Sequence, residues 1–127
     1  MRFGIADCAW AAGFHDGEGT VGCYDRKYVR KDGSVGKRLI AQVTQVERQP
    51  LDRLAAIFGG RVGGPYRTSS GKSLACRWSL ENFEAVQQYV AALWPWLTDV
   101  KREQAKRALK TFVADQRRFF YIEKVAA

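Results

Sequence analysis

The fold of this chain is decided by the stretch Ala11-Ala12-Gly13-Phe14-His15-Asp16-Gly17-Glu18-Gly19. It completes a helical pattern that we predict to run over residues 8–17. One face of this helix is almost without side chains, because small residues recur on it at Ala9, Ala12, Gly13 and Gly17. Such a face allows two backbones to approach closely, so we expect it to pack against another helix.

Glu18 lies at the C-terminal end of this predicted helix. The helix macrodipole is negative there and disfavours an anion by about 0.3–1 kcal/mol. A divalent cation would offset that cost. If two copies of the helix pack about a two-fold axis, their Glu18 carboxylates converge, and paired carboxylates repel each other unless a metal lies between them. The pattern therefore predicts a metal site shared between two copies of the chain.

The rest of the sequence predicts two hairpins and three further helices. Alternating side chains indicate strands at 20–30 and 37–45, and again near 61–67 and 73–80. Helical spacing follows at 51–58, 82–97 and 100–114, and Asp7 is the expected N-cap of the first helix. The order αββαββαα predicts an α+β fold, in which one four-stranded antiparallel sheet carries helices on a single face. At 127 residues we expect a single domain over 1–127.

Positive charge is concentrated in the middle of the chain. The whole sequence has 21 Lys and Arg against 13 Asp and Glu, whereas residues 26–77 alone contain twelve basic and three acidic side chains. A localised basic field favours a polyanion such as nucleic acid, although a solvated basic surface would have the same composition. No stretch approaches the ~20 apolar residues that cross a bilayer, which excludes an integral membrane helix.

Several other features of the sequence do not indicate a metal site, a phosphate-binding loop or a catalytic residue. Three isolated cysteines and a single histidine exclude a zinc module. We expect these cysteines to be reduced thiols in an intracellular, non-secreted protein. Its expected location is the cytoplasm or nucleoid, or an organelle. Gly71-Lys72-Ser73 is not a phosphate-binding loop, because Tyr66 stands where that motif requires glycine. His15 lies on the inward side of its helix, so we interpret it as a structural residue rather than a general base.

The nine residues resemble the LAGLIDADG motif of homing endonucleases, in its variant ending Asp-Gly-Glu-Gly. The resemblance covers about residues 8–114, and it includes Gly59-Gly60 after the second helix, Arg77-Trp78 in the fourth strand, and the segments 93–97 and 100–105. His15 departs from the pattern, since the family usually has an apolar residue there. The resemblance implies the αββαββα fold with a saddle-shaped sheet.

The resemblance also implies an activity: a homodimeric, Mg²⁺-dependent endonuclease that hydrolyses both strands of double-stranded DNA at a long pseudo-palindromic site, and a role in intron or intein mobility. Glu18 and the carbonyl of Gly17 are expected to bind the metal, Gln45 to position a water, and Lys101 to lie near the scissile phosphate. The dimer interface is expected at Ala9, Ala12, Gly13, Asp16 and Gly17. Asp16 is expected to be structural and to form hydrogen bonds across the seam, and direct metal ligation by Asp16 is the alternative.

DNA contacts are expected on the free face of the sheet. Residues suited to base edges or phosphates are Thr20, Tyr24, Arg26, Arg38, Gln42, Thr44, Arg61, Arg77 and Ser79, and those nearer the hairpin tips are Tyr28, Arg30, Arg67 and Lys72. The alternative is an intron maturase or a non-cleaving DNA-binding protein of the same fold. Such proteins often lose the acid of the motif, so the presence of Glu18 favours the nuclease.

Overall fold

The computed structural model describes the backbone of residues 3–126 and the side chains up to residue 117. Its elements follow the predicted order, with a short 3₁₀ helix before the last helix. They are α1 (Ile5–Glu18), β1 (Gly19–Val29), β2 (Val35–Gln45), α2 (Gln49–Phe58), β3 (Arg61–Arg67), β4 (Leu74–Leu80), α3 (Phe83–Leu93), η1 (Trp94–Trp96) and α4 (Asp99–Ala126).

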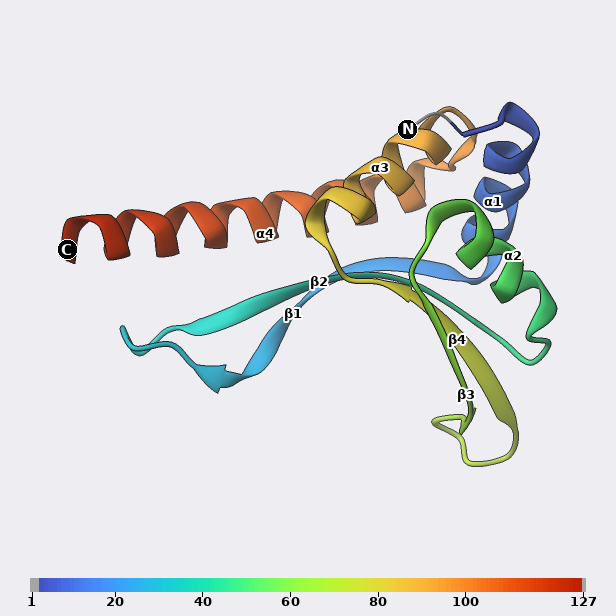
Figure 1. Cartoon of the computed structure of the whole chain (residues 1–127), viewed down its shortest axis with the longest axis horizontal. Coiled ribbons are helices and arrows are strands. Elements are labelled where there is room, and N and C mark those ends of the chain that lie inside the picture. Colours follow the sequence, from blue (N-terminus) through green and yellow to red (C-terminus); the bar gives the residue numbers. More distant parts are fainter. Residues whose placement is uncertain (1–2, 127) are drawn as a thin grey trace.

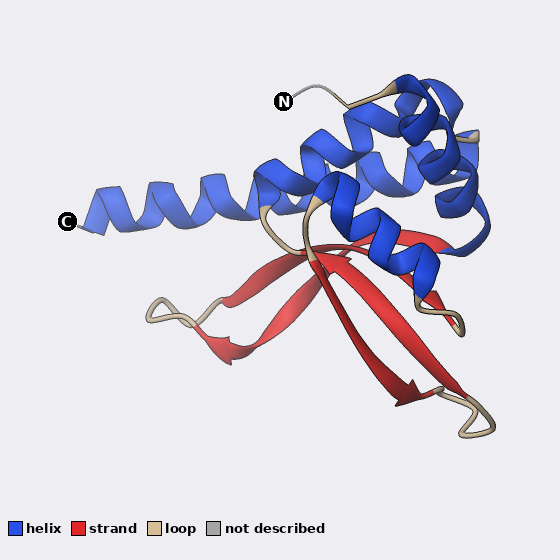
Figure 2. Cartoon of the chain, turned by 45° about the vertical axis from the view of Figure 1, so that its right-hand side comes forward, coloured by secondary structure: helices blue, strands red, loops and turns tan. Residues whose placement is uncertain are grey.

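The four strands form one antiparallel sheet in the order β1-β2-β4-β3. The helices lie together on one side of this sheet, and the other side is uncovered (Figure 2). The two hairpins bend away from the helices and splay apart at their tips, so the uncovered side is concave (Figure 1). The predicted fold class is thereby confirmed.

The core lies between the sheet and the helices. Leu39, Val43 and Trp78 of the sheet are fully buried there, and Leu54 and Tyr89 meet them from the helices. Burying one such side chain contributes about 1.5–3 kcal/mol relative to leaving it exposed. This apolar layer fixes which face of each strand turns toward the helices, and with it which face stays open.

A pair of glycines joins α2 to the sheet. The indole N–H of Trp78 donates to the carbonyl of Gly59 at 2.8 Å. Gly60 has a φ of +91°, and a Cβ built on it would lie 2.5 Å from the carbonyl oxygen of Ser79. A side chain at Gly60 therefore has no room, which explains why the helix stops at a glycine pair as predicted.

All four helices differ from the prediction in their bounds. The helix predicted at 82–97 runs over Phe83–Leu93 and is followed by the 3₁₀ turn Trp94–Trp96, and the helix predicted at 51–58 begins at Gln49. The first helix begins at Ile5 with Gly4 as its N-cap, and Asp7 lies in the first turn, where it pairs with Arg53 at 3.4 Å instead of capping. The last helix runs over Asp99–Ala126 rather than 100–114. Neither glycine nor proline follows residue 114, so nothing local ends the helix. Across residues 3–126 no helix combines the length and the apolar character needed to span a membrane.

Candidate nucleic-acid interface and active site

Glu18 is the last residue of α1, and its side chain is exposed. It makes no hydrogen bond or ion pair with any residue that the structure describes. The adjoining Gly19 is buried, and a Cβ there would lie 2.2 Å from Nδ1 of His15. The helix can therefore turn directly into β1 only because residue 19 is glycine, and this turn leaves the Glu18 carboxylate facing solvent.

The first turns of α4 hold the outer edge of β1 beside Glu18. The ammonium of Lys101 donates to the carbonyl of Gly19 at 2.6 Å. The side-chain carbonyl of Gln104 accepts a hydrogen bond from the backbone N–H of Val21 at 3.1 Å. Lys101 thus binds the residue next to Glu18, the predicted metal-binding acid. Lys101 and Gly19 are 82 positions apart in the chain.

Gln45 lies at the same end of the sheet. Val43 of β2 pairs with Gly19, the first residue of β1. Gln45 therefore lies two residues past this pair along β2, at the end of the sheet where α1 joins β1. Its side-chain oxygen accepts from the backbone N–H of Val46 at 2.9 Å. The structure therefore places Glu18, Gln45 and Lys101, which come from three separate elements, at the same end of the sheet. Among the described residues, no group of three or more His, Cys, Asp or Glu side chains could by itself hold a metal ion.

His15 is buried behind this junction. Its Nδ1 is 2.9 Å from the hydroxyl of Tyr89, and only 1% of the residue is exposed. Burial, together with the positive charge of Lys101, lowers the pKa of His15 to about 4, although the negative charge of Asp16 partly opposes both effects. The imidazole is therefore neutral near pH 7 and inaccessible to a substrate, which agrees with the structural role predicted for it.

Acid is expected to destabilise the fold through His15. The unfolded chain protonates this histidine at a pKa near 6.5, whereas the pKa in the folded chain is about 4, so between these values the unfolded state binds more protons. The free energy of unfolding should fall by up to about 3 kcal/mol as the pH decreases from about 6.5 to about 4. Urea denaturation at pH 7.5, 5.5 and 4.5 measures this loss. His15→Gln should lose less stability over the same range, and an equal loss in both proteins would contradict the assignment.

Asp16 has a partner within its own chain that the sequence did not predict. One oxygen of its carboxylate accepts from both the backbone N–H and the hydroxyl of Thr98, each at 3.1 Å. Thr98 immediately precedes α4, whose first N–H groups lack partners within the helix. Asp16 therefore ties α1 to the start of α4 within one chain through a single oxygen, and a hydrogen bond of Asp16 across a dimer seam stays a prediction.

The small-residue face of α1 is open, but it is narrower than predicted. A Cβ at Gly13 or Gly17 would meet no atom within 4 Å. Ala9 and Gly13 also line a shallow cavity with Trp10, Phe14, Gln49, Pro50 and Arg53. Ala12 has none of its surface exposed and packs in the core, so it cannot contact a second copy. A helix turns by about 100° per residue, which places Ala12 on the inward side next to the exposed Gly13.

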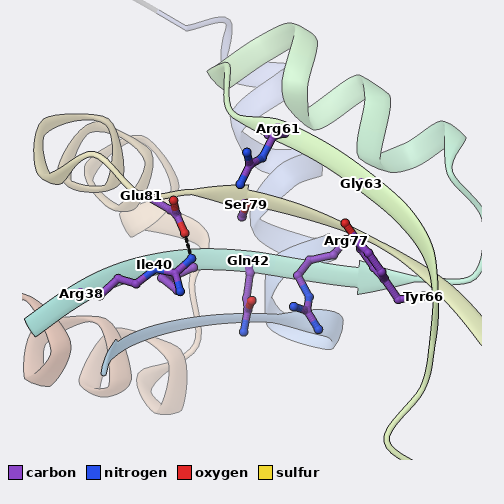
Figure 3. Close-up of a pocket in the computed structure, with 9 residues that line it drawn as sticks. All are labelled: Arg38, Ile40, Gln42, Arg61, Gly63, Tyr66, Arg77, Ser79 and Glu81. Atoms are coloured by element: carbon purple, nitrogen blue, oxygen red, sulfur yellow. Dashed lines mark hydrogen bonds and ion pairs between the residues drawn. The ribbon is translucent and has the colours of Figure 1, made fainter. Parts of the chain in front are cut away.

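The concave side of the sheet contains a hollow of about 450 Å³ lined mainly by polar side chains. Figure 3 shows Gln42 of β2 between Arg38 of the same strand and Arg77 of β4, with Arg61 of β3 on the far side. Five of the predicted DNA contacts line it: Arg38, Gln42, Arg61, Arg77 and Ser79. This concentration of positive charge and amide groups in a strand-lined hollow suits an anionic, groove-shaped partner.

Pairing across the sheet extends this surface beyond the hollow. Thr20 pairs with Gln42, Gln42 with Ser79, and Ser79 with Arg61, so one row of polar residues crosses all four strands. Tyr24 pairs with Arg38, and Thr44 pairs with Arg77. The remaining predicted contacts on the hairpins are exposed at Arg26, Tyr28, Arg67 and Lys72.

Sequence reasoning missed Tyr66 and Glu81 on this face. The guanidinium of Arg77 lies 5.9 Å from the centre of the Tyr66 ring, and Glu81 forms an ion pair with Arg38. A Cβ at Gly63 would be 2.4 Å from the Tyr66 hydroxyl, so the glycine makes room for the ring. A Cβ at Gly22 would likewise be 2.3 Å from the Tyr24 hydroxyl, so this glycine makes room for the Tyr24 ring. A glycine two or three residues before a tyrosine is the signal that could have identified both rings.

Arg30 corrects a prediction about the DNA contacts, because its side chain does not lie on the open face. Its guanidinium makes two hydrogen bonds with the carboxylate of Asp115 in α4, at 3.1 and 2.7 Å. β1 ends at Val29 and its register is irregular between Asp25 and Val29, so side-chain alternation no longer fixes the direction of Arg30. The turn over residues 30–34 instead points it toward the helices.

Comparison with solved structures identifies the fold. The chain is similar to the homing endonuclease I-CvuI in complex with its target, with 25% identity and a TM-score of 0.68 over 88% of this chain and 69% of that one. It is also similar to the LAGLIDADG homing endonuclease I-SmaMI bound to cleaved DNA (19% identity, TM-score 0.70, 87% of this chain, 37% of that one). A third similar structure is the homing endonuclease I-TnaI (21% identity, TM-score 0.65, 92% and 76%).

No protein-family model and no curated protein matches the sequence. The resemblance seen in the motif is nevertheless confirmed at the level of structure, and the chain has the fold of the LAGLIDADG homing endonucleases. With 127 residues and one copy of the motif, its size fits the homodimeric type within that fold.

Proposed function

We propose that this protein is a site-specific DNA endonuclease that acts as a homodimer and cuts both strands of a long, pseudo-palindromic site. The observation that carries the proposal is the position of Glu18, an exposed carboxylate without a partner among the described residues, at the end of the open face of α1 and next to the basic concave sheet. I-CvuI and I-SmaMI, which have this fold, were solved with DNA.

The concave face is proposed to lie in the major groove. β1 and β2 have 11 residues each. At ~3.3 Å per residue these strands span about 36 Å, or about ten base pairs, so two copies would cover about 20. Arg38, Arg61 and Arg77 can each make paired hydrogen bonds to guanine, and Gln42 can do so to adenine. A two-fold protein presents the same surface to each half of the site, which favours a pseudo-palindrome.

The proposed metal site is completed only by two copies. The Glu18 carboxylate and the Gly17 carbonyl are the hard oxygen donors that Mg²⁺ prefers, and the carbonyl lies in the last turn of α1, where helix carbonyls lack intrahelical partners. One chain brings one such carboxylate. Because nothing lies within 4 Å of a Cβ at Gly13 or Gly17, a second α1 can approach closely and bring its own Glu18 alongside. A bound divalent cation would supply an activated water and charge stabilisation for phosphodiester hydrolysis.

The neighbouring side chains have proposed roles that follow from their contacts. The hydrogen bond to Gly19 holds the Lys101 ammonium beside Glu18, where its charge would stabilise the negative charge that develops on the phosphate. The side-chain oxygen of Gln45 is occupied by Val46, so its amide NH₂ remains to orient a water. His15 stays neutral and buried, and takes no part in proton transfer.

The proposal is tested by selection from random duplex DNA followed by cleavage. The wild-type protein should enrich one sequence of about 20 base pairs with two-fold character, and a supercoiled plasmid carrying it should be cut with Mg²⁺. Ca²⁺ should support binding without cutting, because it is larger and less strict in geometry. Failure to enrich any sequence would contradict the proposal. Enrichment without Mg²⁺-dependent cutting would instead indicate a non-cleaving DNA-binding protein.

A pair of variants shows whether the sheet is the binding surface. Replacing Arg38 and Arg61 with alanine should weaken binding about tenfold or more and flatten the salt dependence of the affinity. The control removes two exposed lysines of α4, Lys106 and Lys110, and so changes the net charge equally. Equal losses in both double variants would exclude the concave face as the binding surface.

A further inference from the structure

The β1–β2 hairpin is a long projection whose tip is supported from one side only. Tyr28 and Val29, near its end, are 59% and 64% exposed. α4 extends over the helix-facing side of this hairpin (Figure 1), and it packs against both β1 and β2. An isolated two-stranded hairpin is marginally stable in water, so the direction of the tip depends on what α4 contributes.

The contact that α4 supplies near the tip is an ion pair between Arg30 and Asp115. Two parallel hydrogen bonds of 3.1 and 2.7 Å join the guanidinium to the carboxylate, which is the geometry that fixes orientation best. Arg30 also lies 3.4 Å from the hydroxyl of Ser34, across the turn. The pair and the backbone N–H of Lys37 together lower the pKa of Asp115, so one carboxylate engages the turn and the second strand.

This ion pair differs from the others within the described part of the chain. Its side chains are 11% and 10% exposed, whereas in the other five pairs every side chain is at least 32% exposed. A shielded pair is weak support for stability, because the loss of hydration opposes the attraction. It does hold two elements in one relative orientation, since the two-point contact forms only when the guanidinium and the carboxylate are aligned, and separating them removes the main opposite charge from each shielded group.

We propose that Asp115 is a positioning residue which, through Arg30, sets the direction of the β1–β2 tip and thereby the sequence preference at the outer base pairs of each half-site. The inference rests on the proposed DNA-binding function. Arg26 and Tyr28 are the side chains it would aim at DNA: both are exposed, and the guanidinium lies 5.8 Å from the tyrosine ring centre. The hollow around Gln42 and Arg77 would read the inner base pairs independently, because β4 supports that part of β2.

The test compares base preference position by position on the site selected by the wild-type protein. In Asp115→Asn, discrimination at the outermost three or so base pairs of each half should fall about tenfold, while the inner positions keep their preference. The control is Glu103→Gln, which removes one negative charge from the exposed pair with Lys106 on the same helix. It should leave the whole profile unchanged. The charge swap Arg30→Asp with Asp115→Arg should restore preference relative to Arg30→Asp alone.

Each outcome decides the inference. Outer-position loss with retained inner preference supports it, whereas an unchanged profile or a uniform loss at all positions overturns it. If Asp115→Asn does not fold, Arg30→Lys takes its place, because lysine keeps the charge but not the two-point contact. If the wild-type protein selects no sequence, it is the proposed function that fails.

Discussion

Glu18→Gln is expected to reduce DNA cleavage by two to three orders of magnitude or more, a loss of about the size seen when one catalytic charge interaction is removed. Glutamine keeps the shape and the hydrogen-bonding capacity of the side chain but removes the charge that would hold a cation. Because Glu18 contacts no described residue through hydrogen bonds or ion pairs, the fold should be unaffected. Supercoiled-plasmid cleavage with Mg²⁺, measured beside a gel-shift titration, separates chemistry from binding.

DNA affinity without metal should hold or rise in the same variant, since each subunit loses one negative charge near the phosphates. Glu84→Gln is the matched control: it removes one exposed acid from the first turn of α3, on the helical side of the molecule. That variant should cut at the wild-type rate. Cleavage retained by Glu18→Gln would exclude Glu18 from the active site and leave the metal site of the proposal without its central ligand.

Gly13→Leu is expected to separate the homodimer without unfolding the protomer. A Cβ at this position meets nothing within 4 Å in one chain, and leucine favours a helix over glycine by roughly 1 kcal/mol. In a dimer packed through α1, the added side chains would force the two helices apart. Overpacking costs about 1–3 kcal/mol per side chain, so two copies should weaken dimerisation on the order of a hundredfold or more. Sedimentation velocity over a concentration series measures the change.

Cleavage should be lost together with the dimer, because two chains must contribute Glu18. Gln87→Leu adds the same side chain to an exposed position of α3, and it should leave both the dimer and the activity intact. A dimeric Gly13→Leu protein, or a wild-type protein that is monomeric on DNA, would show that this face of α1 is not the interface.

The sequence alone led to most of the fold and to the residues gathered at the end of α1. Glycine spacing and alternating side chains are local signals, and they placed every strand within one or two residues of its observed bounds. Glu18, Gln45 and Lys101 were identified through the motif and its flanking segments. Their meeting at one end of the sheet follows from the pairing of Gly19 with Val43 and from the hydrogen bond between Lys101 and Gly19.

At three residues the sequence did not predict the contact that the structure shows, and the reason is the same for all three. Asp16, Ala12 and Arg30 each lie in a stretch whose local pattern was interpreted correctly, yet their partners are Thr98, the core and Asp115. These partners are far away in the chain or depend on how α1 and α4 are rotated against the sheet. A helical or strand period fixes which residues share a face, but not which neighbouring element that face meets.

The sequence by itself determined the αββαββαα order, the basic sheet and the acid at the end of α1, because each depends on side chains close together in the chain. Only the tertiary structure decided that Asp16 bonds Thr98 just before α4, that Arg30 turns to the helix Asp99–Ala126, and that Tyr66 joins the concave hollow. The physical reason is that a polar side chain takes the partner that packing brings within hydrogen-bond distance, and packing depends on the burial of the whole chain at once.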